Sequence, residues 1–267
     1  MKVVRERCIA GKTIDMTVKV CSGNHKRKRA PKMNITSEQV QKNNDRYAAK
    51  KLMRKINANF GYGDLHIVLT YKIAPTQKQA KKDRAAFIKA LRREMKRQGI
   101  DLKYIAVTEY QHARIHHHLV INNINAEAIE KIWKKGYVKF AALDASGNYA
   151  KLAEYLIKET TASFRSDESS FKRRYSCSAN LVTPIVTRKY VDESELFDDP
   201  QPIKGYYIDQ DYCRRYEHPV TKLEHVEYIM VAMEEPRRFK KWPGEKIVTD
   251  REYYKTNYGE EQQSLYL

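Results

Sequence analysis

The sequence is poor in cysteine and lacks long hydrophobic runs. Its 267 residues include four cysteines, which lie far apart and form no Cys-x-x-Cys pair: Cys8, Cys21, Cys177 and Cys213. This spacing predicts neither a zinc knuckle nor a dense disulfide framework. No stretch approaches the ~18 consecutive apolar residues of a membrane-spanning helix, and the N-terminus lacks the apolar segment of a signal peptide. We therefore expect a soluble protein of the reducing cytoplasm that does not contact membranes.

A complete phosphate-binding loop for ATP is also missing. Gly11, Lys12 and Thr13 match the end of the Walker A pattern, but Glu6 occupies the position of its first glycine. The sequence therefore predicts no ATPase of the P-loop type.

Acidic residues are outnumbered by basic ones. The chain has 51 lysines and arginines against 33 aspartates and glutamates, which gives a formal net charge of +18. An excess of this size favours a polyanionic partner, nucleic acid before a membrane surface. Basic residues scattered over the surface are the alternative interpretation.

Composition and periodicity divide the chain into three segments, which we expect to cover residues 1–34, 35–190 and 191–267. The first combines a strand-like stretch, Thr13–Val20, with a basic run, His25–Arg29. The last opens with the acidic, turn-rich stretch Val191–Pro202 and continues as irregular aromatic sequence with strand-like pieces such as Glu227–Met233. We interpret it as a small C-terminal appendage of uncertain fold.

Hydrophobic periodicity in the middle segment predicts interspersed helices and strands. Thr76 and Asn125 are the expected N-caps of two of the helices. The expected helices cover residues 37–60, 76–98, 125–135 and 149–160, and the expected strands cover residues 65–72, 103–110, 115–122 and 137–142. This order predicts an α+β domain with a central antiparallel sheet of about five strands and helices packed on it.

Three adjacent histidines, His116, His117 and His118, lie in a short apolar strand. Side chains alternate between the faces of a strand, so His116 and His118 share one face and His117 takes the other. After a four-residue turn, Glu109 of the preceding strand faces His116, whereas a five-residue turn would reverse the parity. Two imidazoles and one carboxylate predict a metal site. An unliganded surface pair of histidines is the alternative.

The remaining histidines have no partner at a useful spacing, and we interpret them as structural or surface residues: His25, His66, His112, His218 and His225.

A second candidate feature is the pair Tyr155 and Lys158 in the last expected helix. Residues three or four apart share a helix face, so Lys158 and Lys151 lie on the side of Tyr155. A neighbouring cation favours the phenolate, which is the nucleophilic form of tyrosine. Tyr149 is a second candidate, but it lies about 120° away around the helix. An amphipathic helix with solvated lysines is the alternative.

These motifs together resemble the rolling-circle replication initiators of the HUH endonuclease superfamily. The family carries a strand like Leu69–Lys72, a His-hydrophobic-His strand and a helix with Tyr-x-x-Lys, in this order. Asn44–Lys72 and Lys172–Val186 are also similar to replication-associated proteins of bacterial phages and integrative mobile elements. The resemblance covers about residues 35–230. It departs from the family at His117, where a bulky hydrophobic residue is usual.

The resemblance implies a fold like that of HUH endonucleases and a nicking activity on single-stranded origin DNA. A divalent cation, Mn²⁺ or Mg²⁺, would be held by His116, His118 and Glu109. Tyr155 would attack the scissile phosphate, leaving a 5′-phosphotyrosyl link and a free 3′-OH, and a later transfer would rejoin the ends. Lys158 would orient the phosphate or the phenolate.

The implied partners are single-stranded DNA at a replication origin, a host helicase and a host polymerase, in the cytoplasm of a bacterial host. The expected DNA-binding residues are basic: Lys151, Arg92, Arg93, Lys172, Arg173 and Arg174. Each basic run is also compatible with a merely solvated face. A relaxase or transposase of the same superfamily is an alternative function, and a non-catalytic DNA-binding regulator is an alternative of a different class.

Overall fold

The computed structural model describes residues 2–21, 38–110, 114–165, 173–218, 222–236 and 241–248. The basic run His25–Arg29 and the turn residues 111–113 lie outside the described residues. Among the described residues, no helix is both long enough and apolar enough to cross a membrane.

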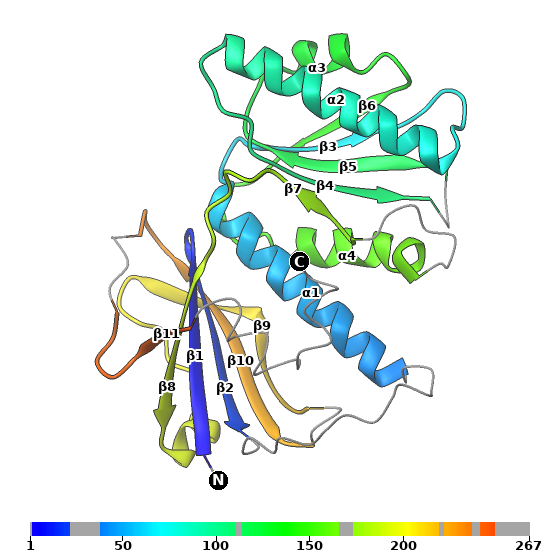
Figure 1. Cartoon of the computed structure of the whole chain (residues 1–267). Coiled ribbons are helices and arrows are strands. Elements are labelled where there is room, and N and C mark those ends of the chain that lie inside the picture. Colours follow the sequence, from blue (N-terminus) through cyan, green and yellow to red (C-terminus); the bar gives the residue numbers. More distant parts are fainter. Residues whose placement is uncertain are drawn as a thin grey trace. The chain divides into compact units, whose positions relative to one another are not determined.

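The described residues form helices and strands in a mixed order (Figure 1). The helices are α1 (Glu38–Asn59), α2 (Gln77–Arg97), α3 (Ala126–Ile132) and α4 (Ala150–Arg165), with a 3-10 helix, η1 (Glu193–Leu196). The strands are β1 (Lys2–Ala10), β2 (Thr13–Cys21), β3 (Leu65–Leu69), β4 (Tyr104–Glu109), β5 (His116–Ile121), β6 (Val138–Ala142), β7 (Ser176–Cys177), β8 (Ile185–Val191), β9 (Tyr206–Glu217), β10 (Glu224–Ala232) and β11 (Lys246–Val248). The predicted α+β class is confirmed, with two antiparallel sheets.

The chain divides into two compact units: unit 1 comprises residues 1–48 and 183–267, and unit 2 comprises residues 49–182. Unit 1 contains a six-stranded sheet in the order β11-β8-β1-β2-β10-β9. The N-terminal and C-terminal parts of the chain therefore share one sheet. We expected the sequence after residue 191 to be largely irregular, whereas the structure contains the long strands β9 and β10 there.

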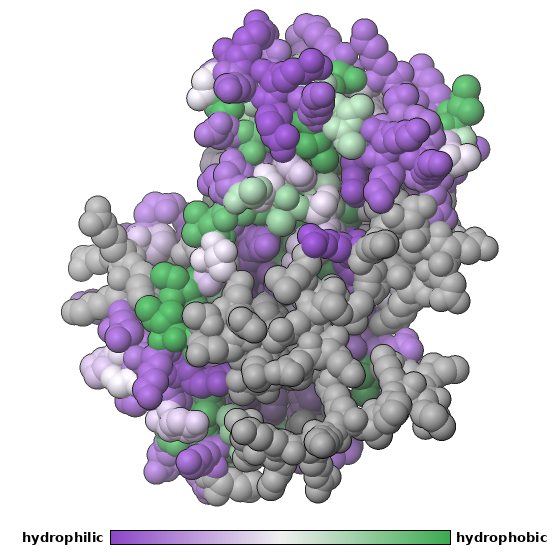
Figure 2. All heavy atoms as spheres, viewed as in Figure 1, coloured by the Kyte–Doolittle hydropathy of each residue, from purple (hydrophilic) through white to green (hydrophobic). Residues whose placement is uncertain are grey.

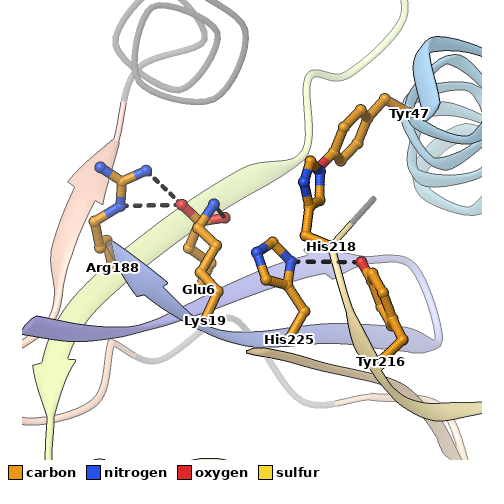
Figure 3. Close-up of polar contacts among 7 residues, drawn as sticks. All are labelled: Glu6, Lys19, Tyr47, Arg188, Tyr216, His218 and His225. Atoms are coloured by element: carbon orange, nitrogen blue, oxygen red, sulfur yellow. Dashed lines mark hydrogen bonds and ion pairs between the residues drawn. The ribbon is translucent and has the colours of Figure 1, made fainter. Parts of the chain in front are cut away.

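One face of the unit 1 sheet carries buried polar side chains (Figure 3). The carboxylate of Glu6 accepts hydrogen bonds from Lys19, at 3.1 Å, and from Arg188. Burial alone would raise the pKa of Glu6, but these two cations outweigh it and hold the pKa at about 2. Beside them, Tyr216 is hydrogen-bonded to His225 at 3.4 Å. The charges on this face are therefore largely paired.

Unit 2 contains the five-stranded sheet β6-β3-β5-β4-β7. Its strand count matches the expected central sheet of about five strands. Alternate residues such as Ile67, Leu119 and Ile121 are fully buried and belong to the same core as Phe87 and Leu91 of α2. In Figure 1, α2 and α3 lie on one side of this sheet and α4 lies on the other. The candidate site occupies the α4 side.

The predicted helix caps of unit 2 are present. The hydroxyl of Thr76 accepts a hydrogen bond from the Gln79 N–H at 3.2 Å, and the side-chain oxygen of Asn125 accepts one from the Glu127 N–H at 2.8 Å. Each cap satisfies a backbone donor that the first helical turn leaves without a partner.

Candidate active site

The strand register places the histidine triplet as the alternation rule predicts. In the antiparallel pairing of β4 with β5, Glu109 lies opposite His116, Thr108 opposite His117 and Val107 opposite His118. Glu109, His116 and His118 therefore share the sheet face on the α4 side. The sequence placed these three side chains on one face, and the register confirms that placement.

His117 faces the helices on the opposite side of the sheet. It is fully buried and is hydrogen-bonded to the Tyr71 hydroxyl at 2.9 Å and to the Thr108 hydroxyl at 2.8 Å. Burial lowers the pKa of His117 to about 3, and Arg84 and the neighbouring histidines add to this effect. His117 is therefore a neutral core residue on the far side of the sheet from His116 and His118.

Three side chains of unit 2 form a group that can hold a metal ion: Glu109, His116 and Glu159. One ligand atom from each lies within 4.8 Å of the others. Glu109 and His116 belong to the expected set, but Glu159 of α4 was not predicted. Glu159 lies one helical turn after Tyr155, so an i,i+4 search around the tyrosine was the sequence signal that could have found it.

Hydrogen bonding around His116 supports a cation at this group. Its Nδ1 atom lies 2.9 Å from the Arg114 carbonyl oxygen, which only accepts, so Nδ1 carries the proton and donates it. The Nε2 lone pair of the neutral ring then faces the Glu109 Oε2 atom at 3.3 Å. Two facing acceptors repel each other, and a metal ion or a proton on Nε2 relieves the repulsion. The residues therefore fit a divalent cation.

His118, the other expected ligand, lies beside this group and is not a member of it. Its ring centroid is 4.8 Å from that of His116. Its Nδ1 atom is 3.2 Å from the Nε2 atom of His66. Its buried Nε2 atom has no hydrogen-bond partner within the described part of the chain. This nitrogen is an additional donor atom available at the same sheet face.

His66 of β3 is the second residue that the sequence interpretation missed as a member of this site. Its ring stacks on His118 with a centroid distance of 5.4 Å. Burial lowers the pKa of His66 to about 4, and burial, with His116 and His66, lowers that of His118 to about 3. The link depends on the pairing of Val68 with His118, which brings two distant strands together. Single-strand spacing carries no signal for it.

Tyr155 projects from α4 toward the same histidines. Its ring meets that of His118 edge to face at a centroid distance of 5.4 Å, and 42% of the residue is exposed. Burial raises the pKa of Tyr155, and the carboxylates of Glu159 and Glu109 raise it further. The expected lowering by Lys158 or Lys151 is therefore outweighed in the protein without metal. Lys158 is exposed on the same helix.

Tyr149 occupies a different environment from Tyr155. It is 5% exposed, and its hydroxyl donates a hydrogen bond to the Asp144 carbonyl oxygen at 2.9 Å. Burial, with Asp144 and Asp64, raises its pKa to about 12. Tyr149 is a packed residue at the start of α4, and Tyr155 is the tyrosine beside the metal-binding group.

The expected DNA-binding residues are spread over unit 2. Lys151 is exposed on α4, Arg173 is exposed, and Arg174 donates to the Thr161 hydroxyl at 3.3 Å. Arg92 and Arg93 are exposed on α2, which covers the opposite side of the sheet. Figure 2 shows that the outer surface over α2 is mostly hydrophilic. Lys172 lies outside the described residues. The structure therefore does not bring Arg92 and Arg93 to the site.

An exposed aromatic residue lies in line with the candidate ligands. The Thr70 N–H donates to the Tyr137 carbonyl oxygen at 2.9 Å, which extends the β3–β6 pairing by one residue. Continuing the β3–β5 register puts Thr70 opposite His116. Tyr137, which is 71% exposed, is therefore two strands from His116, about 10 Å at the usual spacing of strands. The Lys72 ammonium lies 5.8 Å from its ring centroid.

Residues 64–160 match the model of a protein family described as replication-associated proteins of the ORF2 type. No curated protein and no solved structure matches the chain. The matched segment is a little over a third of the sequence, and it contains the histidine triplet, Glu109, Tyr155 and Glu159. The part of the chain that carries the candidate site is thus similar to replication-associated proteins, which fits a role in initiating DNA replication.

Proposed function

We propose that this protein is a metal-dependent nicking enzyme that initiates rolling-circle replication on single-stranded origin DNA, with an active site of the HUH type in unit 2. One observation carries the proposal: the Tyr155 ring lies against His118, beside the group formed by Glu109, His116 and Glu159. The replication-associated family match covers all five residues.

Glu109, His116 and Glu159 would hold the divalent cation, with the His118 Nε2 atom as a further donor. Two carboxylates and an imidazole suit Mn²⁺ or Mg²⁺, which prefer oxygen-rich ligand sets. When bound, the cation supplies positive charge that polarises the scissile phosphate and offsets the two carboxylates beside Tyr155. Those carboxylates raise the Tyr155 pKa in its absence, so the ligands themselves link metal loading to the nucleophile.

Tyr155 is the proposed nucleophile. Its oxygen forms a bond to the scissile phosphorus while the bond from phosphorus to the 3′ oxygen breaks. The phenolic proton leaves as the new bond forms, and the departing 3′ oxygen takes up a proton, so no net proton is released. The 5′ phosphate remains on the protein and the other strand end is a 3′-OH. Attack by that hydroxyl on the phosphotyrosine reverses the step and rejoins the strand. Lys158, exposed on α4, is placed to orient the phosphate.

Tyr137, Lys139 and Lys72 are the proposed contacts for the DNA strand. Lys139 lies opposite Val68, which in turn lies opposite His118, so Lys139 shares the sheet face of the site. An exposed aromatic ring between lysines is suited to a stacked base with phosphates on either side. This surface replaces Arg92 and Arg93 of α2 as the expected track next to the site.

The test uses single-stranded oligonucleotides that tile the DNA around the gene, incubated with the protein and Mn²⁺. An oligonucleotide labelled at its 3′ end should become covalently attached to the protein on a denaturing gel. The same oligonucleotide labelled at its 5′ end should be shortened, remain free, and be extended by a polymerase. Attachment of the 5′ label would contradict the proposed polarity of cleavage.

Two tyrosine variants complete the experiment. Tyr155→Phe should abolish the covalent adduct, whereas Tyr149→Phe should keep it, because Tyr149 is hydrogen-bonded in the core. An adduct in Tyr155→Phe would overturn the assignment. DNA binding without any adduct in the unaltered protein would favour the non-catalytic regulator. A relaxase or transposase would form the same adduct and then join it to a different DNA end.

A further inference from the structure

A buried chain of polar side chains lies behind the candidate site, on the opposite face of the sheet. Its centre is His117, which the proposed reaction does not use. One ring nitrogen of His117 meets Thr108 of β4, and the other meets Tyr71, which follows β3. The outer members belong to α2: Arg84 hydrogen-bonds to Thr108, and Asp83 hydrogen-bonds to Tyr71.

The donors and acceptors of this chain can be assigned from its two ends. The Asp83 carboxylate only accepts, so the Tyr71 hydroxyl donates to it, and the Tyr71 oxygen accepts from His117 Nε2–H at 2.9 Å. The Nδ1 atom of the neutral ring then accepts from the Thr108 hydroxyl at 2.8 Å. The Thr108 oxygen accepts from the Arg84 guanidinium at 2.8 Å. All bonds run in one direction, from the guanidinium to the carboxylate.

The carboxylate end of the chain is itself supported. Asp83 accepts a hydrogen bond from the Gln79 side chain at 2.8 Å and pairs with the Lys135 ammonium at 3.1 Å. Hydrogen bonds aligned in one direction polarise each other and strengthen in a buried environment. Loss of one hydroxyl leaves the adjacent buried group unsatisfied, which is costly. The network therefore holds His117 in one orientation and one tautomer.

The residues of this network adjoin the proposed metal ligands in sequence. His117 separates His116 from His118, and Thr108 immediately precedes Glu109. Thr108 and His117 are also directly opposite each other in the β4–β5 pairing. The network therefore fixes the backbone of both strands at the positions that aim the ligands toward the other face.

We propose that His117, Tyr71, Thr108 and Arg84 position the metal-ligating residues through the sheet, as a hydrogen-bonded support on its reverse face. This inference rests on the proposed metal site. None of the four touches the reacting atoms, so they are positioning residues. An apolar side chain at position 117 would fill the core equally well, and the complete set of polar partners is what indicates a positioning role. The network also accounts for the departure of this sequence from the family pattern at that position.

Two nearly isosteric variants test the proposal in the full-length protein: Tyr71→Phe and Thr108→Val each remove one hydroxyl. Binding of Mn²⁺ is measured from the signal of the free ion by electron paramagnetic resonance. Loss of an outer-shell partner typically weakens metal affinity 10–100-fold, so we expect at least about a tenfold loss in both variants. Thr108→Ser keeps the hydroxyl and should retain the affinity.

A core variant separates positioning from general loosening. Leu91→Val shortens a fully buried side chain of α2 in the same core, without touching the polar chain. It should lower the free energy of unfolding in urea and leave the Mn²⁺ affinity unchanged. The inference is overturned if Leu91→Val weakens Mn²⁺ binding as much as Tyr71→Phe does, or if Tyr71→Phe and Thr108→Val bind Mn²⁺ like the unaltered protein.

A second measurement does not use the metal at all. In the metal-free protein, long-range ¹H–¹⁵N correlation spectra should show His117 as the Nε2–H tautomer, and Tyr71→Phe should disturb that state. A Nδ1–H tautomer in the unaltered protein would overturn the assigned direction of the chain. If the unaltered protein binds no Mn²⁺ and forms no DNA adduct, the proposed function fails and the positioning role fails with it. Normal binding in every variant overturns the positioning role alone.

Discussion

Glu159 of α4 and His116 of β5 place ligand atoms within 4.8 Å of each other, although they belong to different elements on the two sides of a packing interface. Glu159 also follows Tyr155 by one helical turn. The same helix therefore contributes both the proposed nucleophile and a candidate metal ligand, which makes the position of α4 on the sheet decisive for the site.

The first prediction concerns Glu159→Gln, which removes the negative charge and keeps the size of the side chain. We expect Mn²⁺ affinity to fall by about tenfold or more, because a hard cation loses a charged oxygen ligand. Titration of the protein with Mn²⁺, followed by electron paramagnetic resonance, measures the change.

Glu154→Gln is the matched control for Glu159→Gln. Glu154 is exposed on α4 and is not part of the metal-binding group. Its substitution should leave Mn²⁺ affinity unaltered. Equal affinities for Glu159→Gln and the unaltered protein would remove Glu159 from the ligand set and favour His118 in its place.

The comparison of Glu109 with Glu159 shows what local pattern can predict. The period of two residues in a strand and one assumed turn length were enough to place Glu109 opposite His116. Glu159 depends on how α4 docks on the sheet, and His66 depends on the pairing of β3 with β5. Both relations are set by tertiary packing, which leaves no period in the sequence.

Unit 1 was harder to predict for a related reason. Strand β2 pairs with β1 through a hairpin and with β10 from the far end of the chain. Strand β9 is an edge strand with mostly exposed or half-buried side chains, so it needs no clear apolar alternation. Charged residues such as Glu6 are buried in the sheet, where hydropathy alone predicts exposure.

The second prediction concerns this buried charge cluster. Glu6→Gln leaves the ammonium of Lys19 and the guanidinium of Arg188 without their carboxylate. Breaking a buried ion pair by removing one partner typically costs about 3–5 kcal/mol, so unfolding in urea should require correspondingly less denaturant. Glu217→Gln removes the exposed pair with Lys222 and should change stability by less than about 1 kcal/mol. Equal effects of the two substitutions would contradict the buried pairing.

The third prediction is a loss of stability in mild acid. Burial, with Lys19 and His218, lowers the pKa of His225 to about 3, whereas an unfolded histidine titrates near 6.5. Between these values the unfolded chain binds a proton that the folded chain does not, so stability falls as pH decreases. His225 alone should contribute about 2 kcal/mol of this loss between pH 7 and pH 5.

Urea titrations at pH 7 and pH 5, followed by circular dichroism, measure this dependence. His225→Gln removes the titrating group, so the difference in unfolding free energy between the two pH values should shrink. The His66, His117 and His118 pKa values are lowered in the same direction, and a pH dependence should therefore persist in the variant. An unchanged difference in His225→Gln would show that His225 does not titrate as its burial requires.

The last prediction concerns the strand of DNA. Tyr137→Ala should weaken binding of a single-stranded oligonucleotide roughly 5- to 150-fold, the equivalent of about 1–3 kcal/mol for one stacked base. Tyr62 supplies the control, because it is 81% exposed and precedes β3, at the opposite end of the strand from Thr70 and Tyr137. Fluorescence anisotropy without divalent metal separates binding from cleavage. If Tyr62→Ala weakens binding as much as Tyr137→Ala, the DNA does not follow the row of residues that ends at His116.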